Sequence, residues 1–236
     1  MEWILRDGHR FIIQITVNLF NIKRETGIWK GVSMMAVSNY DTALEQARLL
    51  FLTYDRSALA EKFSLATEGD TVFIPFVGRT YRLSLSDGRI TDECGRSADY
   101  NTAMSIYDVL CWSKPLCRTC GNFAPINSVA RAFHSSGLGE SLTDRHALYF
   151  SKAPHLLERA CIALGGTKDS KGDVAYRLDV FPFLPVLLRF WQADDEFPAS
   201  LQLLWDTNTL DFVHYETTYY IAGHLIARLR ELTEQV

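Results

Sequence analysis

Apolar and polar residues alternate most clearly between Gly172 and Asp206. Three short runs there are rich in β-branched and aromatic residues, which favour strands: 174–181, 184–191 and 201–205. Proline and acidic residues separate these runs, as they do in the connections of antiparallel sheets. The pattern therefore predicts an antiparallel β-meander at the centre of the fold.

Helical periodicity predicts most of the remaining structure. Apolar residues recur every three or four positions in five segments: 40–51, 56–66, 100–112, 153–164 and 217–232. Two shorter strands, 71–76 and 79–85, are predicted to form a hairpin with its turn at Gly78. Strands and helices do not alternate regularly, so we expect an α+β fold: an antiparallel β-meander sheet with helices packed on one face and an N-terminal helical pair.

The first 34 residues differ from the rest of the chain. Their one alternating run, 11–20, has no obvious hairpin partner, and Met34 and Met35 come just before the first predicted helix. Residues 1–34 are therefore either a translated leader or an edge strand of the main sheet, because periodicity does not distinguish the two. Residues 35–236 are expected to form a single α+β domain.

Charge and cysteine content exclude several classes of protein. The net charge of −4, without a long basic run, argues against nucleic-acid binding, and no apolar run approaches the length of a membrane span. Five cysteines in a chain of 236 residues do not resemble a secreted disulfide framework. We therefore expect a cytoplasmic protein without nucleic-acid or membrane partners.

Residues 113–143 are predicted to be irregular, with one short helix near 127–133, and they contain the sharpest local motif. Cys117 and Cys120 are spaced so that both sulfurs can reach one metal ion, and Gly121 follows them. Cys111 and His134 are the nearby candidates to complete a zinc or iron site. The alternative is that Cys117 and Cys120 are simply two reduced thiols in a loop.

The segment that follows is rich in serine and glycine. His134, Ser135, Ser136 and Gly137 could offer backbone amides to an anionic ligand, although the segment is not a P-loop. A plain loop is the alternative interpretation.

An acidic connector separates the last two strands of the predicted meander. Trp191, Asp194, Asp195 and Glu196 are ligand candidates there. Clustered carboxylates can bind a hard cation or divide the roles of acid and base, and an aromatic ring such as that of Trp191 can line a pocket for a planar ligand. A solvated loop is the alternative.

A second polar group lies where the closing helix begins. His214 and Glu216 are ligand candidates there, and Thr217 or Thr218 is expected to cap the helix. A short apolar run at 210–213 precedes them.

Several segments together resemble one known family. They are NTAMSIYDVLCWSK (101–114), HSSGLGE (134–140), the run from 164 to 176, LPVLLRFWQADDEFPASLQLLWD (184–206) and HYETTYY (214–220). The resemblance, over roughly residues 36–232, is to an uncharacterised family of anaerobic bacteria and archaea that is known only as a domain of unknown function (DUF3786). It implies a cytoplasmic protein and brings no established reaction or catalytic residue. Some relatives carry iron–sulfur-type modules, which implies a role in anaerobic cofactor metabolism.

Three functions remain open from the sequence. The first is a module that binds a small molecule or cofactor where the 113–143 segment meets the acidic connector. The second is a hydrolase or transferase that uses Asp194, Asp195 or Glu196 with His134 or His214. The third is a protein–protein adaptor, for which a protein partner is required.

Overall fold

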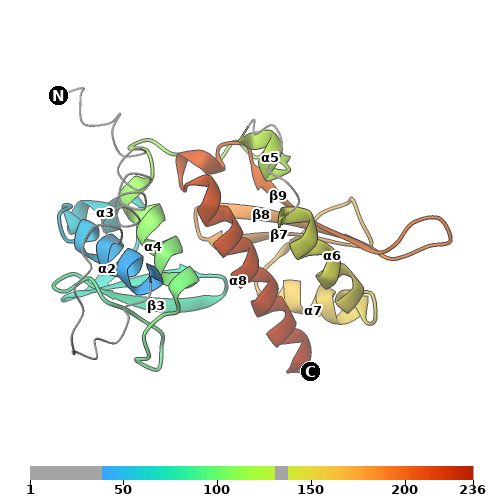
Figure 1. The fold of residues 1–236 in the computed structure, drawn as a ribbon, viewed down its shortest axis with the longest axis horizontal. Coiled ribbons are helices and arrows are strands. Elements are labelled where there is room, and N and C mark those ends of the chain that lie inside the picture. The colour runs from blue at the N-terminus through green and yellow to red at the C-terminus, as the bar shows by residue number, and fades with distance from the viewer. Residues whose placement is uncertain (1–38, 131–137, 236) are drawn as a thin grey trace, which may run out of the picture. The chain divides into compact units, whose positions relative to one another are not determined.

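The meander expected between Gly172 and Asp206 consists of three long antiparallel strands. The computed structural model describes residues 39–130 and 138–235, and in it these strands are β7 (Val174–Phe181), β8 (Leu184–Trp191) and β9 (Ser200–Asp206) (Figure 1). Two short strands, β5 (Phe123–Ala124) and β6 (Thr167–Lys168), extend the sheet at its edges, so that the strand order is β5-β9-β8-β7-β6. We call this five-stranded sheet sheet B.

The other elements follow the predicted order closely. The described helices are α2 (Asn39–Phe51), α3 (Arg56–Lys62), α4 (Tyr100–Trp112), α5 (Ile126–Val129), α6 (Leu138–Phe150), α7 (Pro154–Ala163), α8 (Tyr215–Glu234) and the 3₁₀ turn η1 (Thr209–Asp211). The remaining strands are β1 (Ala66–Glu68), β2 (Thr71–Phe76), β3 (Arg79–Ser84), β4 (Ile90–Thr91), β5 (Phe123–Ala124) and β6 (Thr167–Lys168). Strands β1 to β4 form a second antiparallel sheet, sheet A. The α+β prediction, with its N-terminal helical pair, is confirmed.

Helices cover one face of sheet B. On β8, Val186, Leu188 and Phe190 are fully buried and belong to the main core, as Leu201 and Trp205 of β9 do. Helices α6, α7 and α8 pack on this side, through contacts of α6 with β9, α7 with β7 and α8 with α6 and α7. The opposite face carries no described helix.

The register of β8 places the two tryptophans of the meander on different faces of sheet B. The even-numbered side chains of β8 are buried in the main core, so Trp191 lies on the helix-free face, where it pairs with Ser200. Trp205 lies on the helix-covered face and is only 2% exposed. Ser200, the partner of Trp191, and Trp205 are five positions apart on β9. Because successive side chains of a strand point to opposite faces, the two tryptophans cannot share one core.

Sheet A meets sheet B at a tight hairpin. The turn between β2 and β3 is formed by Val77 and Gly78, both with positive φ, and the Val77 amide donates to the Val180 carbonyl of β7 over 2.9 Å. A Cβ on Gly78 would lie 2.5 Å from Leu164 Cδ2, so only glycine fits there without a shift of that side chain.

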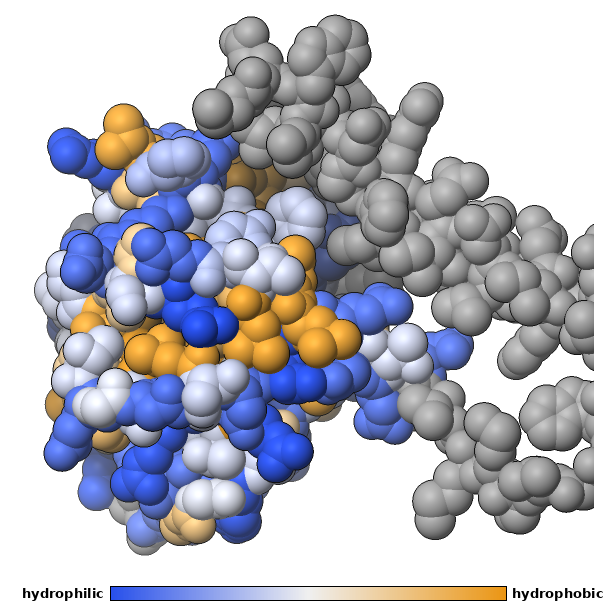
Figure 2. All heavy atoms as spheres, turned by 90° about the vertical axis from the view of Figure 1, so that its left-hand side faces the viewer, coloured by the Kyte–Doolittle hydropathy of each residue, from blue (hydrophilic) through white to orange (hydrophobic). Residues whose placement is uncertain are grey.

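On the outer face of β2, Phe73 is only partly buried. Figure 2 shows one side of the domain, on which apolar residues lie among hydrophilic ones.

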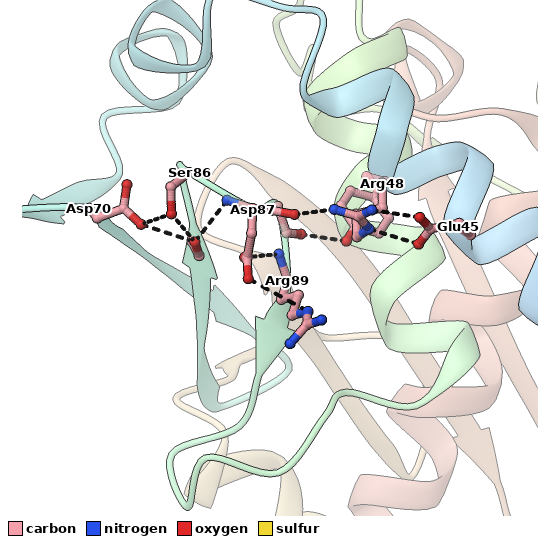
Figure 3. Close-up of polar contacts among 9 residues, drawn as sticks. Glu45, Arg48, Asp70, Ser86, Asp87 and Arg89 are labelled. Atoms are coloured by element: carbon pink, nitrogen blue, oxygen red, sulfur yellow. Dashed lines mark hydrogen bonds and ion pairs between the residues drawn. The ribbon is translucent and has the colours of Figure 1, made fainter.

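A polar network ties the β3–β4 connection to α2. Arg48 binds the Glu45 carboxylate and the backbone carbonyl of Asp87, while Ser84 and Ser86 donate to Asp70 (Figure 3). Arg48 and Asp70 thus stabilise the turn at residues 84–87.

The apolar run at 210–213 lies in and after the 3₁₀ turn η1. Two local predictions were wrong. Helix α3 ends at Lys62 instead of continuing to residue 66, because Ser64 adopts positive φ and β1 begins at Ala66. The segment expected to be irregular up to residue 143 becomes helical at Leu138, the start of α6. The expectation for residues 1–34 lies outside the described residues and stays a prediction.

Helix α8 crosses between the two halves of the domain, with α4 on one side and α7 on the other (Figure 1). Its His224 stacks on Phe76 of β2 at 4.8 Å between ring centroids, and its Nδ1 atom lies 3.1 Å from the Thr102 hydroxyl of α4. None of the helices described here has the length and apolar character that a membrane span requires.

Replacing each tryptophan of the meander with alanine tests the register. We expect Trp205→Ala to lower the free energy of unfolding by about 3–5 kcal/mol, because it opens a cavity in the core. Trp191→Ala on the helix-free face should cost only about 1 kcal/mol or less. Urea unfolding of the two variants measures both values, and equal losses would contradict the assignment of faces.

Candidate functional site

A groove of about 250 Å³ runs along β9, and we call it the β9 groove. Its walls come from α5 and the residues before it, from β9, from the first half of α8 and from Thr143 of α6. Apolar side chains dominate: Ile126, Leu201, Leu203, Leu204, Trp205 and Ala222. A concave, mostly apolar surface with a few polar groups is the usual form of a small-molecule site.

Polar groups line one side of the β9 groove. The Tyr215 hydroxyl donates to Asn127 Oδ1 over 2.6 Å and lies 2.6 Å from the Tyr219 hydroxyl. Asn127 and Tyr219 border the groove, together with Gln202 and Thr218. These hydrogen bonds fix the tyrosine rings, so the polar side of the groove is formed before any ligand arrives.

The groove exists because the neighbouring strand β5 is very short. It pairs with β9 only at Asp206 and Trp205, through Phe123 and Ala124. Pro125 comes next, and its lack of an N–H group prevents it from extending the ladder. Residues 200–204 of β9 therefore have no partner strand on this side within the described parts of the chain, and α5 leaves space beside them.

A buried carboxylate positions the segment that leads into β5. Asp206 is fully buried, and its side chain accepts hydrogen bonds from the backbone amides of Cys120 (3.0 Å), Gly121 (2.7 Å) and Asn208 (2.9 Å). The Thr207 amide adds a bond of 2.8 Å to the Asn122 carbonyl. Bonds from amides to a carboxylate are among the stronger hydrogen bonds in proteins, so Asp206 holds this segment against the end of β9.

A histidine–aspartate pair lies where α8 begins. Asp108 of α4 accepts from the His214 backbone amide over 2.8 Å, and its other oxygen lies 2.6 Å from His214 Nδ1. The His214 ring packs against Trp112 with its edge, at 5.0 Å between centroids. The hydrogen bond to Asp108 raises the pKa of His214 above its ordinary value of 6.5, against an opposing effect of partial burial.

Comparison with known proteins identifies the family of this chain. A family described as "Domain of unknown function (DUF3786)" matches residues 55–228, which is most of the chain. The chain belongs to the DUF3786 family. No curated protein and no protein of solved structure matches it. The description of the family names no activity, so the function of this DUF3786 domain has to be argued from its own geometry.

The cysteines proposed as metal ligands have different surroundings in this DUF3786 domain. Cys111 is buried in α4, where burial raises the pKa of its thiol to about 12. Burial also raises the pKa of Cys117, with Lys62 opposing the effect, whereas Cys120 lies against Asp206 and Thr207. No group of three or more His, Cys, Asp or Glu side chains able to hold a metal occurs among the residues that the structure describes. His134, Ser135, Ser136 and Gly137 lie outside those residues, so the anion-loop and metal hypotheses that use them stay predictions.

The acidic connector lies far from the cysteine loop. It precedes Ser200, whereas Cys120 contacts Asp206, and these two ends of β9 are about 20 Å apart at the rise of an extended strand. Asp194 accepts from the Glu196 and Phe197 amides of its own turn, and these bonds lower its pKa. Asp195 and Glu196 are exposed beside it. The structure therefore does not bring the connector and Cys120 together. Residues 131–137 of the 113–143 segment lie outside the described residues, so the first hypothesis from the sequence stays a prediction.

The start of α8 also differs from expectation. His214 occupies the N-cap position, so Thr217 and Thr218 lie inside the helix and are buried rather than capping it. Glu216 is an exposed residue of the first turn. Sequence reasoning selected His214 but missed its partner Asp108, because a buried aspartate in an apolar helix is recognised only from its contacts.

The pH dependence of stability tests the pair of Asp108 and His214. A raised pKa means that the folded state binds the proton more tightly than the unfolded state does, so the stabilisation is complete below pH 6.5 and is lost as the pH rises through the folded-state pKa. We expect His214→Gln to lower the free energy of unfolding more at about pH 5.5 than at about pH 8.5.

His224 supplies the control for that experiment. Burial lowers the pKa of His224, so its contribution has the opposite sign and weakens as the pH falls below 6.5. The loss caused by His224→Gln should therefore be smaller at the lower pH. A loss for His214→Gln that is equal at both pH values would show that Asp108 does not stabilise the charged ring.

Proposed function

We propose that this DUF3786 domain binds a small organic molecule with one planar ring in the β9 groove. The observation that carries the proposal is the combination of an apolar wall, formed by β9 and Ala222, with the fixed polar side of Asn127 and Tyr219. An apolar wall favours a ring by burial, and a few fixed polar groups select its substituents.

The size of the groove supports a ligand of this class. Its volume is about 250 Å³, and a dry apolar cavity of about 150 Å³ is enough to hold benzene. One ring with one or two polar substituents therefore fits, whereas a dinucleotide or a porphyrin does not. The polar groups available are amide and hydroxyl groups, which suit a phenol or a ring amide better than a strongly charged ligand.

An enzymatic role, as a hydrolase or transferase, is the second candidate, and the pair of Asp108 and His214 favours it. A carboxylate that orients an imidazole is a common arrangement for a general acid or base. His214 is followed directly by Tyr215, whose hydroxyl bonds to Asn127 at the groove. In this role Asp108 takes the place of the acidic connector, which the sequence suggested as the source of the catalytic carboxylate.

The setting that we propose for either role is the cytoplasm of an anaerobic organism, as the resemblance to the DUF3786 family implies.

Two alanines of α8 provide a matched test of binding. Ala222 lines the β9 groove, whereas Ala227 is exposed on the same helix. We expect 4-fluorophenol to bind the wild-type protein, and we expect Ala222→Leu to weaken that binding by at least about tenfold, because a leucine side chain occupies part of the groove. Ala227→Leu should leave the affinity unchanged. Fluorine NMR titration measures all three, and melting temperatures confirm that both variants are folded.

Two results would overturn the proposal. One is that 4-fluorophenol, phenol and indole all fail to bind the wild-type protein at millimolar concentration. The other is that Ala222→Leu and Ala227→Leu bind 4-fluorophenol equally well, which would place the ligand elsewhere.

A further inference from the structure

A second cavity lies on sheet B, and it is lined differently from the β9 groove. It has a volume of about 450 Å³ and is lined by nine residues: Gly121, Asn122, Phe123, Thr167, Lys168, Asp169, Arg177, Leu187 and Arg189. We call it the arginine cavity. Arg177 and Arg189 occupy odd positions of β7 and β8, where the even positions face the helix-covered core, so this cavity belongs to the helix-free face.

Segments at both edges of sheet B border this cavity. Residues 121–123 lie at the β5 edge and residues 167–169 at the β6 edge, with three strands between them. The cavity therefore extends across the helix-free face from one edge of the sheet towards the other.

The charge of the arginine cavity is opposite to that of the whole chain. Among its lining residues, Arg177 and Arg189 are basic and Asp169 is acidic, whereas the chain carries a net charge of −4. Lys168 pairs with Tyr176 of the helix-covered core and binds Glu158 of α7, so its charge lies on the other face of the sheet. Basic groups that line a concave surface raise the local concentration of anions.

The present partners of these basic groups leave room for an anion. Arg177 contacts Asp179 at 3.4 Å, and its side chain is about half exposed. Exposed pairs of this kind contribute little to stability, so a doubly charged anion can compete with them. Arg189 is more buried, and Asp169 binds its Nε and Nη2 atoms. A guanidinium has five N–H donors, so this pair orients Arg189 without using all of them.

We propose that the arginine cavity binds a small molecule through a phosphate group. Arg177 contributes charge from β7, and the oriented guanidinium of Arg189 on β8 contributes directed hydrogen bonds. Leu187, which is only 5% exposed, and Phe123 give the cavity an apolar side for the organic part of the ligand. This site is independent of the β9 groove.

Pyrophosphate is the probe for this site, and two arginines provide the matched comparison. Arg177 lines the cavity, while Arg82 is an exposed arginine of β3 in sheet A. We expect calorimetric titration to show one pyrophosphate per chain at about 150 mM salt, and Arg177→Gln to weaken it at least about tenfold. Arg82→Gln should bind as the wild-type protein does. Arg177 is about half exposed, so its substitution should not disturb folding, and melting temperatures check this.

Other outcomes would overturn the proposal. If pyrophosphate binds only at low ionic strength, or if Arg177→Gln and Arg82→Gln reduce the affinity equally, the contact is general charge attraction rather than a site. An absence of pyrophosphate binding to the wild-type protein would also remove the site. None of these results affects the 4-fluorophenol test, so failure of one site is distinguishable from failure of the other.

Discussion

The buried carboxylate of Asp206 determines the position of the walls that form both cavities. Its hydrogen bonds to the amides of Cys120 and Gly121 hold the incoming segment at the end of β9, where β5 then pairs for two residues. Residues 121–123 of that segment border the arginine cavity, and residues 125–127 border the β9 groove. A carboxylate buried without such donors would be costly, so the strand end and the loop depend on each other.

The two faces of sheet B differ because successive side chains of each strand point to opposite faces. Core positions of β7, β8 and β9 meet helices α6, α7 and α8, and the same side leads to the apolar β9 groove. The intervening positions include Arg177 and Arg189, which face the helix-free side. One short sheet thus borders both an apolar groove and a cavity lined by two arginines.

Local sequence patterns predicted most helices and strands. The features that they did not predict depend on contacts between residues far apart in the sequence. The strands 174–181 and 184–191 and the helix 100–112 were predicted with the observed bounds, since proline, caps and alternation act locally. The β9 groove could not be predicted, because it depends on where Pro125 stops the pairing of β5 with β9. The partnership of Asp206 with the Cys120 amide joins residues 86 positions apart, and no local pattern reports it. The acidic connector had a clear local signal, but its hydrogen bonds stay within its own turn.

Amide hydrogen exchange in wild-type protein and in Asp206→Ala tests most directly whether this carboxylate fixes the shared wall. We expect amides of residues 117–127 to exchange at least about tenfold faster in the variant, because their anchor is lost, while β7 and β8 keep their protection. Unchanged protection in 117–127 would contradict a positioning role for Asp206. Loss of protection throughout sheet B would also contradict it, since Asp206 would then support the whole sheet rather than the wall of the two sites.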